Sequence, residues 1–126
     1  MGKKILKILT IDDNQNCLHV VAKFFTLIGG HIVEVAENGA DGLRKAAELK
    51  PDLILLDMVM PDMNGLQVMD GLSADASTRH IPVIVITGTR LTGNEYGILA
   101  AKKNFMLLEE KPADFNKILK VIEATL

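Results

Sequence analysis

The sequence predicts an α/β fold in which five parallel β-strands alternate with five helices. Two patterns carry this prediction. Apolar residues recur three or four positions apart in the stretches that separate the strands, as expected for amphipathic helices. Continuously apolar strands that alternate with such helices are typical of a parallel sheet covered on both faces, and right-handed crossovers then favour a doubly wound, three-layer arrangement. The predicted strands are short runs rich in β-branched and other apolar residues, at 5–11, 31–36, 53–56, 81–86 and 105–108.

The first strand and the first helix differ clearly in their hydrophobic period. Residues 5–11 form one apolar run, whereas from Asn14 onward the apolar side chains return every three or four residues. We expect this helix to reach about Ile28, because the pair Gly29-Gly30 supplies a helix stop. Its predicted buried face consists of Leu18, Val21, Phe25 and Ile28.

The later helices follow from the same pattern. A turn at Asn38-Gly39 precedes the second helix, which ends before Pro51. The fourth helix is weaker than the others, because Gly93 and Gly97 interrupt it. The predicted helices after the first are 40–47, 65–73, 91–102 and a last one with Phe115, Ile118, Leu119 and Ile122 on one face.

Length and composition exclude several classes of protein. The 126 residues are 48% hydrophobic and 24% charged, which suits one globular domain and not a disordered or collagen-like chain. The longest stretch without Asp, Glu, Lys or Arg has ten residues, too few for a membrane-spanning helix. With a net charge of −2, the chain shows no basic nucleic-acid footprint. A single cysteine, Cys17, and no secretory segment predict a cytoplasmic protein with no nucleic-acid or membrane partner.

Polar side chains gather where the predicted strands end. Asp12 and Asp13 follow the first strand, Asp57 follows the third, Thr87 ends the fourth, and Lys111 follows the fifth. The carboxyl ends of parallel strands open on one edge of the sheet, where ligands bind in open α/β sheets. We therefore expect these five residues to converge.

Three carboxylates in one crevice require compensation. Two like charges about 5 Å apart repel by roughly 3 kcal/mol at an effective dielectric constant near 20. Lys111 offsets part of this repulsion, so either one acid holds a proton or a cation is present. Hard oxygen ligands on an open surface suit Mg²⁺, whose free coordination positions accept phosphoryl oxygens. A carboxylate beside such an ion can act as a nucleophile toward phosphorus.

Four stretches of the sequence carry a family resemblance. The chain resembles the response-regulator receiver domain of two-component signalling over nearly its whole length, about Ile5 to Ala124. The resemblance implies the strand order 2-1-3-4-5 and a single receiver domain, 1–126, with no output domain. The matching strings are Ile11-Asp12-Asp13-Asn14, the run from Leu55 to Gly65 (LLDMVMPDMNG), Thr87-Gly88 and Lys111-Pro112.

The resemblance also implies a role for each acid. Asp57 is expected to accept a phosphoryl group from a histidine of a kinase or of a histidine phosphotransfer protein. Asp13 and Asp57 are expected to bind Mg²⁺ directly, with the backbone carbonyl of Val59 as a third ligand and Asp12 acting through a metal-bound water. Such a domain is not an enzyme toward other molecules and catalyses only its own phosphorylation and autodephosphorylation.

The remaining roles that the resemblance implies concern the residues around these acids. Lys111 is expected to pair with the phosphoryl oxygens and to precede Pro112 through a cis peptide bond. Thr87 is expected to turn toward the phosphoryl group and to pull its loop inward, which switches contacts with a downstream protein target.

One position departs from the family pattern. Family members usually carry Tyr or Phe three residues before the lysine, as a ring that turns inward on activation, and this chain has Leu108 there. Phe105 is expected to face elsewhere, because it lies three residues earlier on the strand. The transfer chemistry needs no ring. The departure at Leu108 therefore bears on the usual output through the fourth helix, the fifth strand and the fifth helix, and not on the acceptance of phosphate.

Three alternatives remain beside the phosphoacceptor hypothesis. Leu108 favours an interaction module whose partner binding is independent of phosphorylation. A phosphohydrolase of the haloacid-dehalogenase type uses Asp-x-Asp, whereas the acids here are adjacent, and the chain leaves no room for a cap domain. A flavodoxin-like flavin protein needs stacking aromatics, and the chain has no Trp and one Tyr, Tyr96.

Of the remaining polar residues, Cys17 is expected to be buried and inert, and Glu109-Glu110 to be a solvated strand end.

Overall fold

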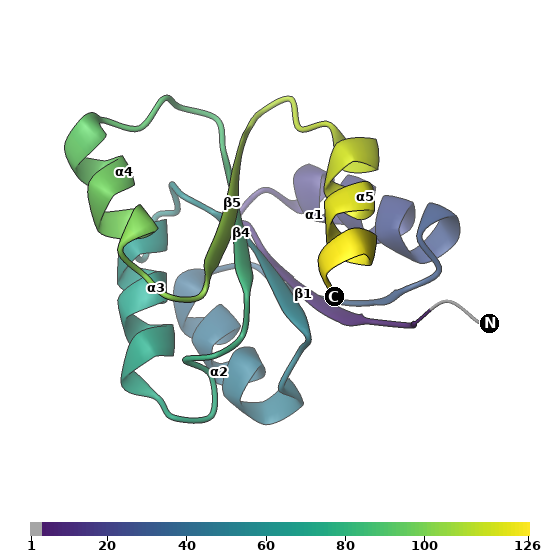
Figure 1. Ribbon diagram of the computed structural model, residues 1–126, viewed down its shortest axis with the longest axis horizontal. Coiled ribbons are helices and arrows are strands. Elements are labelled where there is room, and N and C mark those ends of the chain that lie inside the picture. The colour runs from purple at the N-terminus through teal and green to yellow at the C-terminus, as the bar shows by residue number, and fades with distance from the viewer. Residues whose placement is uncertain (1–3) are drawn as a thin grey trace.

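All five predicted strands form one parallel sheet in the computed structural model, which describes residues 4–126 (Figure 1). The strand order is β2-β1-β3-β4-β5, which confirms the doubly wound topology. Residues 1–3 of the predicted domain lie outside the described part. The elements are β1 (Lys7–Ile11), α1 (Gln15–Lys23), η1 (Phe24–Ile28), β2 (Ile32–Ala36), α2 (Gly39–Leu49), β3 (Leu53–Asp57), α3 (Gly65–Ala74), β4 (Val83–Thr87), α4 (Gly93–Ala100), β5 (Phe105–Glu110) and α5 (Phe115–Thr125).

The sheet separates two apolar cores. Alternate residues of β1, β3 and β4 point to opposite faces, and most of them are apolar and buried. Helices α2, α3 and α4 pack on one face, whereas α1, η1 and α5 pack on the other (Figure 1). Within residues 4–126, no helix combines the length and apolar character that crossing a membrane requires.

The first helix differs from the prediction. It is α-helical only to Lys23 and continues as a π-helix, η1, instead of one regular helix to Ile28. Ile28, which was predicted on the buried face, is 64% exposed, so that part of the prediction is wrong. The backbone N–H of Gly29 donates to the carbonyl of Phe24 at 3.1 Å, five residues back. In this wider turn the neighbouring rings of Phe24 and Phe25 both contact Phe115 of α5, with ring centroids 5.6 and 6.0 Å apart. Apolar spacing alone does not reveal such a change of helix type.

Strand β5 differs from the prediction in two ways. It continues to Glu110 instead of ending at Leu108, so Lys111 follows it directly. It also contains a bulge: Val83 of β4 pairs with Phe105, but the next residue, Ile84, pairs with Leu107. The extra residue shifts the alternation by one, so that Phe105 and Leu108 pack against the same core. The expectation that Phe105 faces elsewhere is therefore wrong.

The bulge also explains the position of Glu109. This residue was expected to be solvated, but it is buried on the face that α5 covers. Its Oε1 lies 2.6 Å from Nζ of Lys117 on α5. An ion pair thus compensates the buried carboxylate, and Glu110 alone is the exposed member of the pair.

The contact between α2 and β1 predicts the effect of a single methyl group. A Cβ at Gly42 lies 2.5 to 3.0 Å from three side-chain carbons of the fully buried Ile11. We expect Gly42→Ala to lower the free energy of unfolding by about 1–3 kcal/mol, because a packed core resists added volume. Urea denaturation measures this.

Gly97→Ala in α4 is the matched control. A Cβ at Gly97 has no neighbour within 4 Å, so the change is expected to stabilise the protein by about 0.5–1 kcal/mol through helix propensity. Equal effects of the two substitutions would contradict the packing described here.

Candidate functional site

The sheet brings residues from four strands to one edge. Asp12 follows β1, Asp57 is the last residue of β3, Thr87 is the last residue of β4, and Lys111 follows β5. Strand register aligns these ends, since Ile11 pairs with Leu56 and Asp57 pairs with Ile86. The convergence expected from the sequence is therefore present.

The acidic cluster consists of Asp12, Asp13 and Asp57. One carboxylate oxygen from each lies within 4.8 Å of the others. Asp12 and Asp57 are each 7% exposed, whereas Asp13 is exposed. Two of the three charges are therefore largely removed from water, and the third faces the solvent.

Local hydrogen bonds fix the position of Asp12. Its Oδ1 accepts a hydrogen bond from the backbone N–H of Asn14 at 2.9 Å. Asn14 in turn caps α1, and its side chain accepts from the backbone N–H of Cys17 at 3.1 Å. This pair of bonds turns the chain from β1 into α1, so that the Asp12 carboxylate remains beside the strand end.

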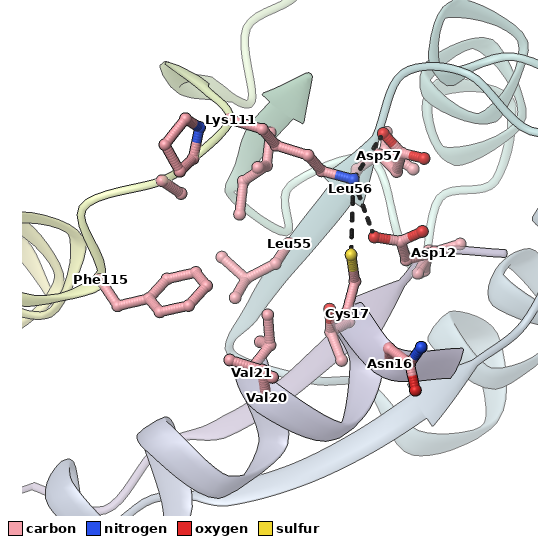
Figure 2. Close-up of a pocket in the computed structure, with 15 residues that line it drawn as sticks. Asp12, Asn16, Cys17, Val20, Val21, Leu55, Leu56, Asp57, Lys111 and Phe115 are labelled. Carbon is pink, nitrogen blue, oxygen red and sulfur yellow. Dashed lines mark hydrogen bonds and ion pairs between the residues drawn. The ribbon is translucent and has the colours of Figure 1, made fainter. Parts of the chain in front are cut away.

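Lys111 reaches across the crevice to both buried acids. Its Nζ lies 3.2 Å from Oδ2 of Asp12 and 3.6 Å from Oδ1 of Asp57 (Figure 2). Partial burial acts to lower the pKa of the ammonium, but Asp57 and Asp12 outweigh it and the pKa is raised. The backbone N–H of Lys111 donates to the carbonyl of Thr87 at 2.8 Å, and the peptide bond to Pro112 is cis.

The charge of Asp57 is only partly compensated. Burial raises the pKa of its carboxyl to about 6, and the charge of Asp12 adds to this effect against the opposing influence of Lys111. A carboxyl with this pKa is mostly ionised at neutral pH, at a cost in stability. Additional positive charge at the cluster is therefore favoured.

Thr87 is buried and directed toward its own loop. Its hydroxyl donates to the carbonyl of Thr89 at 2.9 Å and accepts from the backbone N–H of Thr89 at 3.2 Å. The hydroxyl must leave these partners before it can bond a group on Asp57. Leu108 packs from β5 against the core under α4 and does not line the crevice.

A cavity of about 550 Å³ opens beside the acids, between α1 and the segment that joins β5 to α5 (Figure 2). Its walls are mostly apolar and include Val20, Val21, Leu55 and Phe115. Cys17 was expected to be buried and inert, but it is partly exposed and lines this cavity.

The Cys17 contact was absent from the predicted site. Its Sγ lies 4.0 Å from Nζ of Lys111. One helical turn separates Cys17 from Val21, which the sequence placed on the buried face, and this spacing is a signal for its inward position.

The loop between β3 and α3 begins directly after Asp57. Met58 and Met60 are buried in the core, whereas Val59 between them is 60% exposed. The backbone N–H of Gly65 donates to the carbonyl of Met58 at 2.8 Å, which closes the loop at its base. Val59 thus follows Asp57 by two residues in the sequence, and its side chain lies outside the core.

The donor set suits a hard divalent cation. Three carboxylate oxygens within 4.8 Å, one of them on an exposed residue, match the oxygen ligands and the open coordination of Mg²⁺. Burial, with the charge of Asp12 as the second cause, raises the pKa of Asp57, so a cation beside this carboxylate would favour its ionised form. The residues present therefore fit a magnesium ion.

The buried charge predicts how Asp57→Asn changes stability. Folding raises the pKa of Asp57 from 3.8 to about 6, so its stabilising contribution is present below about pH 4 and is lost as the pH rises through 6. A difference of about 2 between the folded and unfolded pKa values corresponds to about 3 kcal/mol. In EDTA, we expect Asp57→Asn to raise the free energy of unfolding by up to this amount at pH 8 and to change it little at pH 4. Chemical denaturation across this range measures the difference, and curves that stay parallel would contradict it.

Comparison with known proteins agrees with this architecture. The family model for the response regulator receiver domain matches residues 8–123. The chain is 36% identical over 121 residues to protein PilH of Pseudomonas aeruginosa, covering 95% of this chain and 97% of that protein. It is 33% identical over 88 residues to the polar-differentiation response regulator DivK of Brucella anthropi, covering 70% of this chain and 71% of that protein.

The solved structures show the same fold. The chemotaxis protein CheY4 of Vibrio cholerae superimposes with a TM-score of 0.84 at 23% identity, covering 98% of this chain and all of that one. At this identity the likeness concerns the fold alone. With the family match over most of the chain and the acidic cluster at the strand ends, the protein belongs to the response regulator receiver domain family of two-component signalling.

Proposed function

We propose that Asp57 accepts a phosphoryl group in a Mg²⁺-dependent reaction and that residues 1–126 act as one receiver module. The observation that carries this proposal is the arrangement of Asp57, whose buried carboxylate shares the ammonium of Lys111 with a second buried acid, Asp12. An oxygen of Asp57 also lies within 4.8 Å of carboxylate oxygens of Asp12 and Asp13, two potential metal ligands.

The family resemblance supplies the proposed metal set. Asp13 and Asp57, together with the backbone carbonyl of Val59, would hold Mg²⁺, and Asp12 would act through a metal-bound water. When bound, the ion supplies positive charge that neutralises the acids and the incoming phosphoryl oxygens. Asp12 remains oriented throughout by the N–H of Asn14.

The transfer step conserves atoms and charge. A carboxylate oxygen of Asp57 forms a bond to phosphorus as the P–N bond of a phosphohistidine breaks, and the imidazole nitrogen keeps the electron pair. Lys111 then pairs with the phosphoryl oxygens, since its ammonium already lies 3.6 Å from Asp57. The donor is a histidine kinase or a histidine phosphotransfer protein in the cytoplasm.

The phosphorylated state changes the loop that contains Thr87. The phosphoryl group carries about −1.5 to −2 charges in place of the single charge of the carboxylate, so the crevice becomes more negative by about 0.5 to 1 charge. Thr87 exchanges its bonds to Thr89 for a bond to the phosphoryl group and draws the β4–α4 loop inward, which alters a surface for a downstream protein. The chain itself acts on no other substrate.

Incubation with acetyl phosphate tests the proposal. We expect the wild-type protein to gain the mass of one phosphoryl group in the presence of Mg²⁺ and none in EDTA, as measured by intact-protein mass spectrometry. Asp57→Asn should show no gain. A gain that persists in Asp57→Asn, or no gain in the wild-type protein, would refute the proposal.

Leu108 supports a second candidate, an interaction module whose partner binding does not respond to phosphorylation. Its side chain packs against the core from the strand that faces α4, and it offers no ring to change position. The affinity for a captured partner, measured with and without beryllofluoride, separates the two functions. Equal affinities favour the second candidate, whereas a change of tenfold or more favours the switch.

A further inference from the structure

The loop that joins β3 to α3 is tied to the N-terminus of α2 by one exposed side chain. Oδ1 of Asp62 accepts a hydrogen bond from the backbone N–H of Gly39 at 3.1 Å, and Oδ2 accepts from that of Ala40 at 3.0 Å. The two amides belong to the first turn of α2, where helix geometry supplies no acceptor. Asp62 is 23 and 22 residues away from them in the sequence, so the contact joins two separate segments.

The charge of Asp62 suits this position. The helix N-terminus carries partial positive charge, and bonds from backbone amides to a carboxylate are stronger than those to a neutral acceptor. The amides of Gly39 and Ala40 lower the pKa of Asp62, which keeps the carboxylate ionised. The helix already has its own cap, since Asn38 accepts from the N–H of Asp41 at 2.8 Å. Asp62 therefore adds a link between segments and does not replace the local cap.

The side chain of Met63 packs against Gly39 beside the two bonds. A Cβ at position 39 would lie 2.1 Å from Cγ of Met63, so a larger residue there would displace this side chain of the loop. Beyond Met63, the loop ends at Asn64, which caps α3 in a reciprocal pair of bonds with Gln67. The distal half of the loop is thus held by α2 and α3 together.

The proximal half of the loop contains Val59, whose carbonyl is the third magnesium ligand of the proposed function. Met58 and Met60 are buried on either side, but apolar burial is non-directional and does not set the rotation of the peptide group between them. Asp62 lies three residues after Val59 and makes two directed bonds to a rigid helix. The bond from the Gly65 N–H to the Met58 carbonyl holds the base of this segment, and Asp62 holds its distal end from outside the core.

We propose that Asp62 is a positioning residue for the magnesium site: by tying the loop to the first turn of α2, it sets the Val59 carbonyl for coordination. The inference rests on the proposed function, because it requires Mg²⁺ at the acidic cluster. Asp62 itself does not touch the ion. Its loss is expected to raise the Kd for Mg²⁺ about tenfold, the lower end of the effect of outer-sphere partners on metal affinity.

The experiment measures Mg²⁺ affinity from the backbone amide NMR signals of residues 12, 13, 57 and 59. Asp62→Ala removes both bonds, Asp62→Asn keeps one acceptor and loses the charge, and Asp62→Glu keeps a carboxylate. We expect about a tenfold rise in Kd for Asp62→Ala, a smaller rise for Asp62→Asn and partial recovery for Asp62→Glu. Amide hydrogen exchange at Gly39 and Ala40 without metal reports the tether directly, and it should accelerate in Asp62→Ala.

Glu37→Gln is the matched control for charge. Glu37 lies at the same end of the molecule, directly after β2, and its carboxylate accepts from the side chain of Gln15 and not from the loop. Asp62→Asn and Glu37→Gln each remove one negative charge, so a long-range field effect would appear in both and fade in high salt. The positioning effect is specific to Asp62 and persists at high salt.

Phosphorylation by acetyl phosphate separates the possible outcomes. If Asp62 positions the metal ligand, Asp62→Ala needs more Mg²⁺ but reaches the wild-type rate at saturation. A Kd that changes no more than in Glu37→Gln, or a rate defect that saturating Mg²⁺ does not relieve, would overturn the inference and leave the proposed function intact. Wild-type signals that do not respond to Mg²⁺ would instead refute the proposed function itself.

Discussion

The proposed chemistry depends on several negative charges that the fold holds close together at one edge of a parallel sheet. Asp12 and Asp57 are buried within reach of each other and of a single ammonium, Lys111, so the crevice carries more negative charge than positive charge. Burial raises the pKa of Asp57 to about 6, which shows that the fold holds this carboxylate at a cost. A cation bound beside these acids would relieve this repulsion. The proposed magnesium site and the proposed phosphoryl transfer to Asp57 would therefore depend on the same buried charges.

The rest of the molecule holds these charges in place. The sheet carries apolar residues on both faces, and two layers of helices cover it, so the strand ends cannot move independently. Directed hydrogen bonds also hold the segments at this edge of the sheet. The N–H of Asn14 donates to Asp12 after β1, and amides in the first turn of α2 donate to Asp62 after β3. The N–H of Lys111 donates to the Thr87 carbonyl, which joins β5 to β4. The Thr87 hydroxyl differs from these groups, because its bonds run to Thr89 within its own loop and not to a neighbouring segment.

Much of the fold and of the acidic cluster follows from the sequence. Alternation of apolar strands and amphipathic helices specified the five strands, and the polar residues at the strand ends specified which side chains meet. Predictions failed where one residue changed the local geometry. A single extra residue in β5 reversed the expected facing of Phe105 and buried Glu109, and hydrophobic period carries no signal for a bulge. The π-helical turn beside Phe24 likewise depends on tertiary packing, which spacing along the chain does not encode. For Cys17, the spacing from Val21 indicates an inward position but does not identify Lys111 as its neighbour.

The central claim is that three carboxylates bind one divalent ion, although they come from the ends of two strands that lie far apart in the sequence. Replacement of Mg²⁺ by paramagnetic Mn²⁺ tests this most directly, because line broadening in NMR spectra falls steeply with distance from the ion. Substoichiometric Mn²⁺ is predicted to erase the backbone signals around residues 12, 13, 57 and 59 first, to leave the opposite end of the sheet sharp, and to be displaced by excess Mg²⁺. Broadening spread evenly over the acidic surface, or centred away from residue 57, would contradict the account.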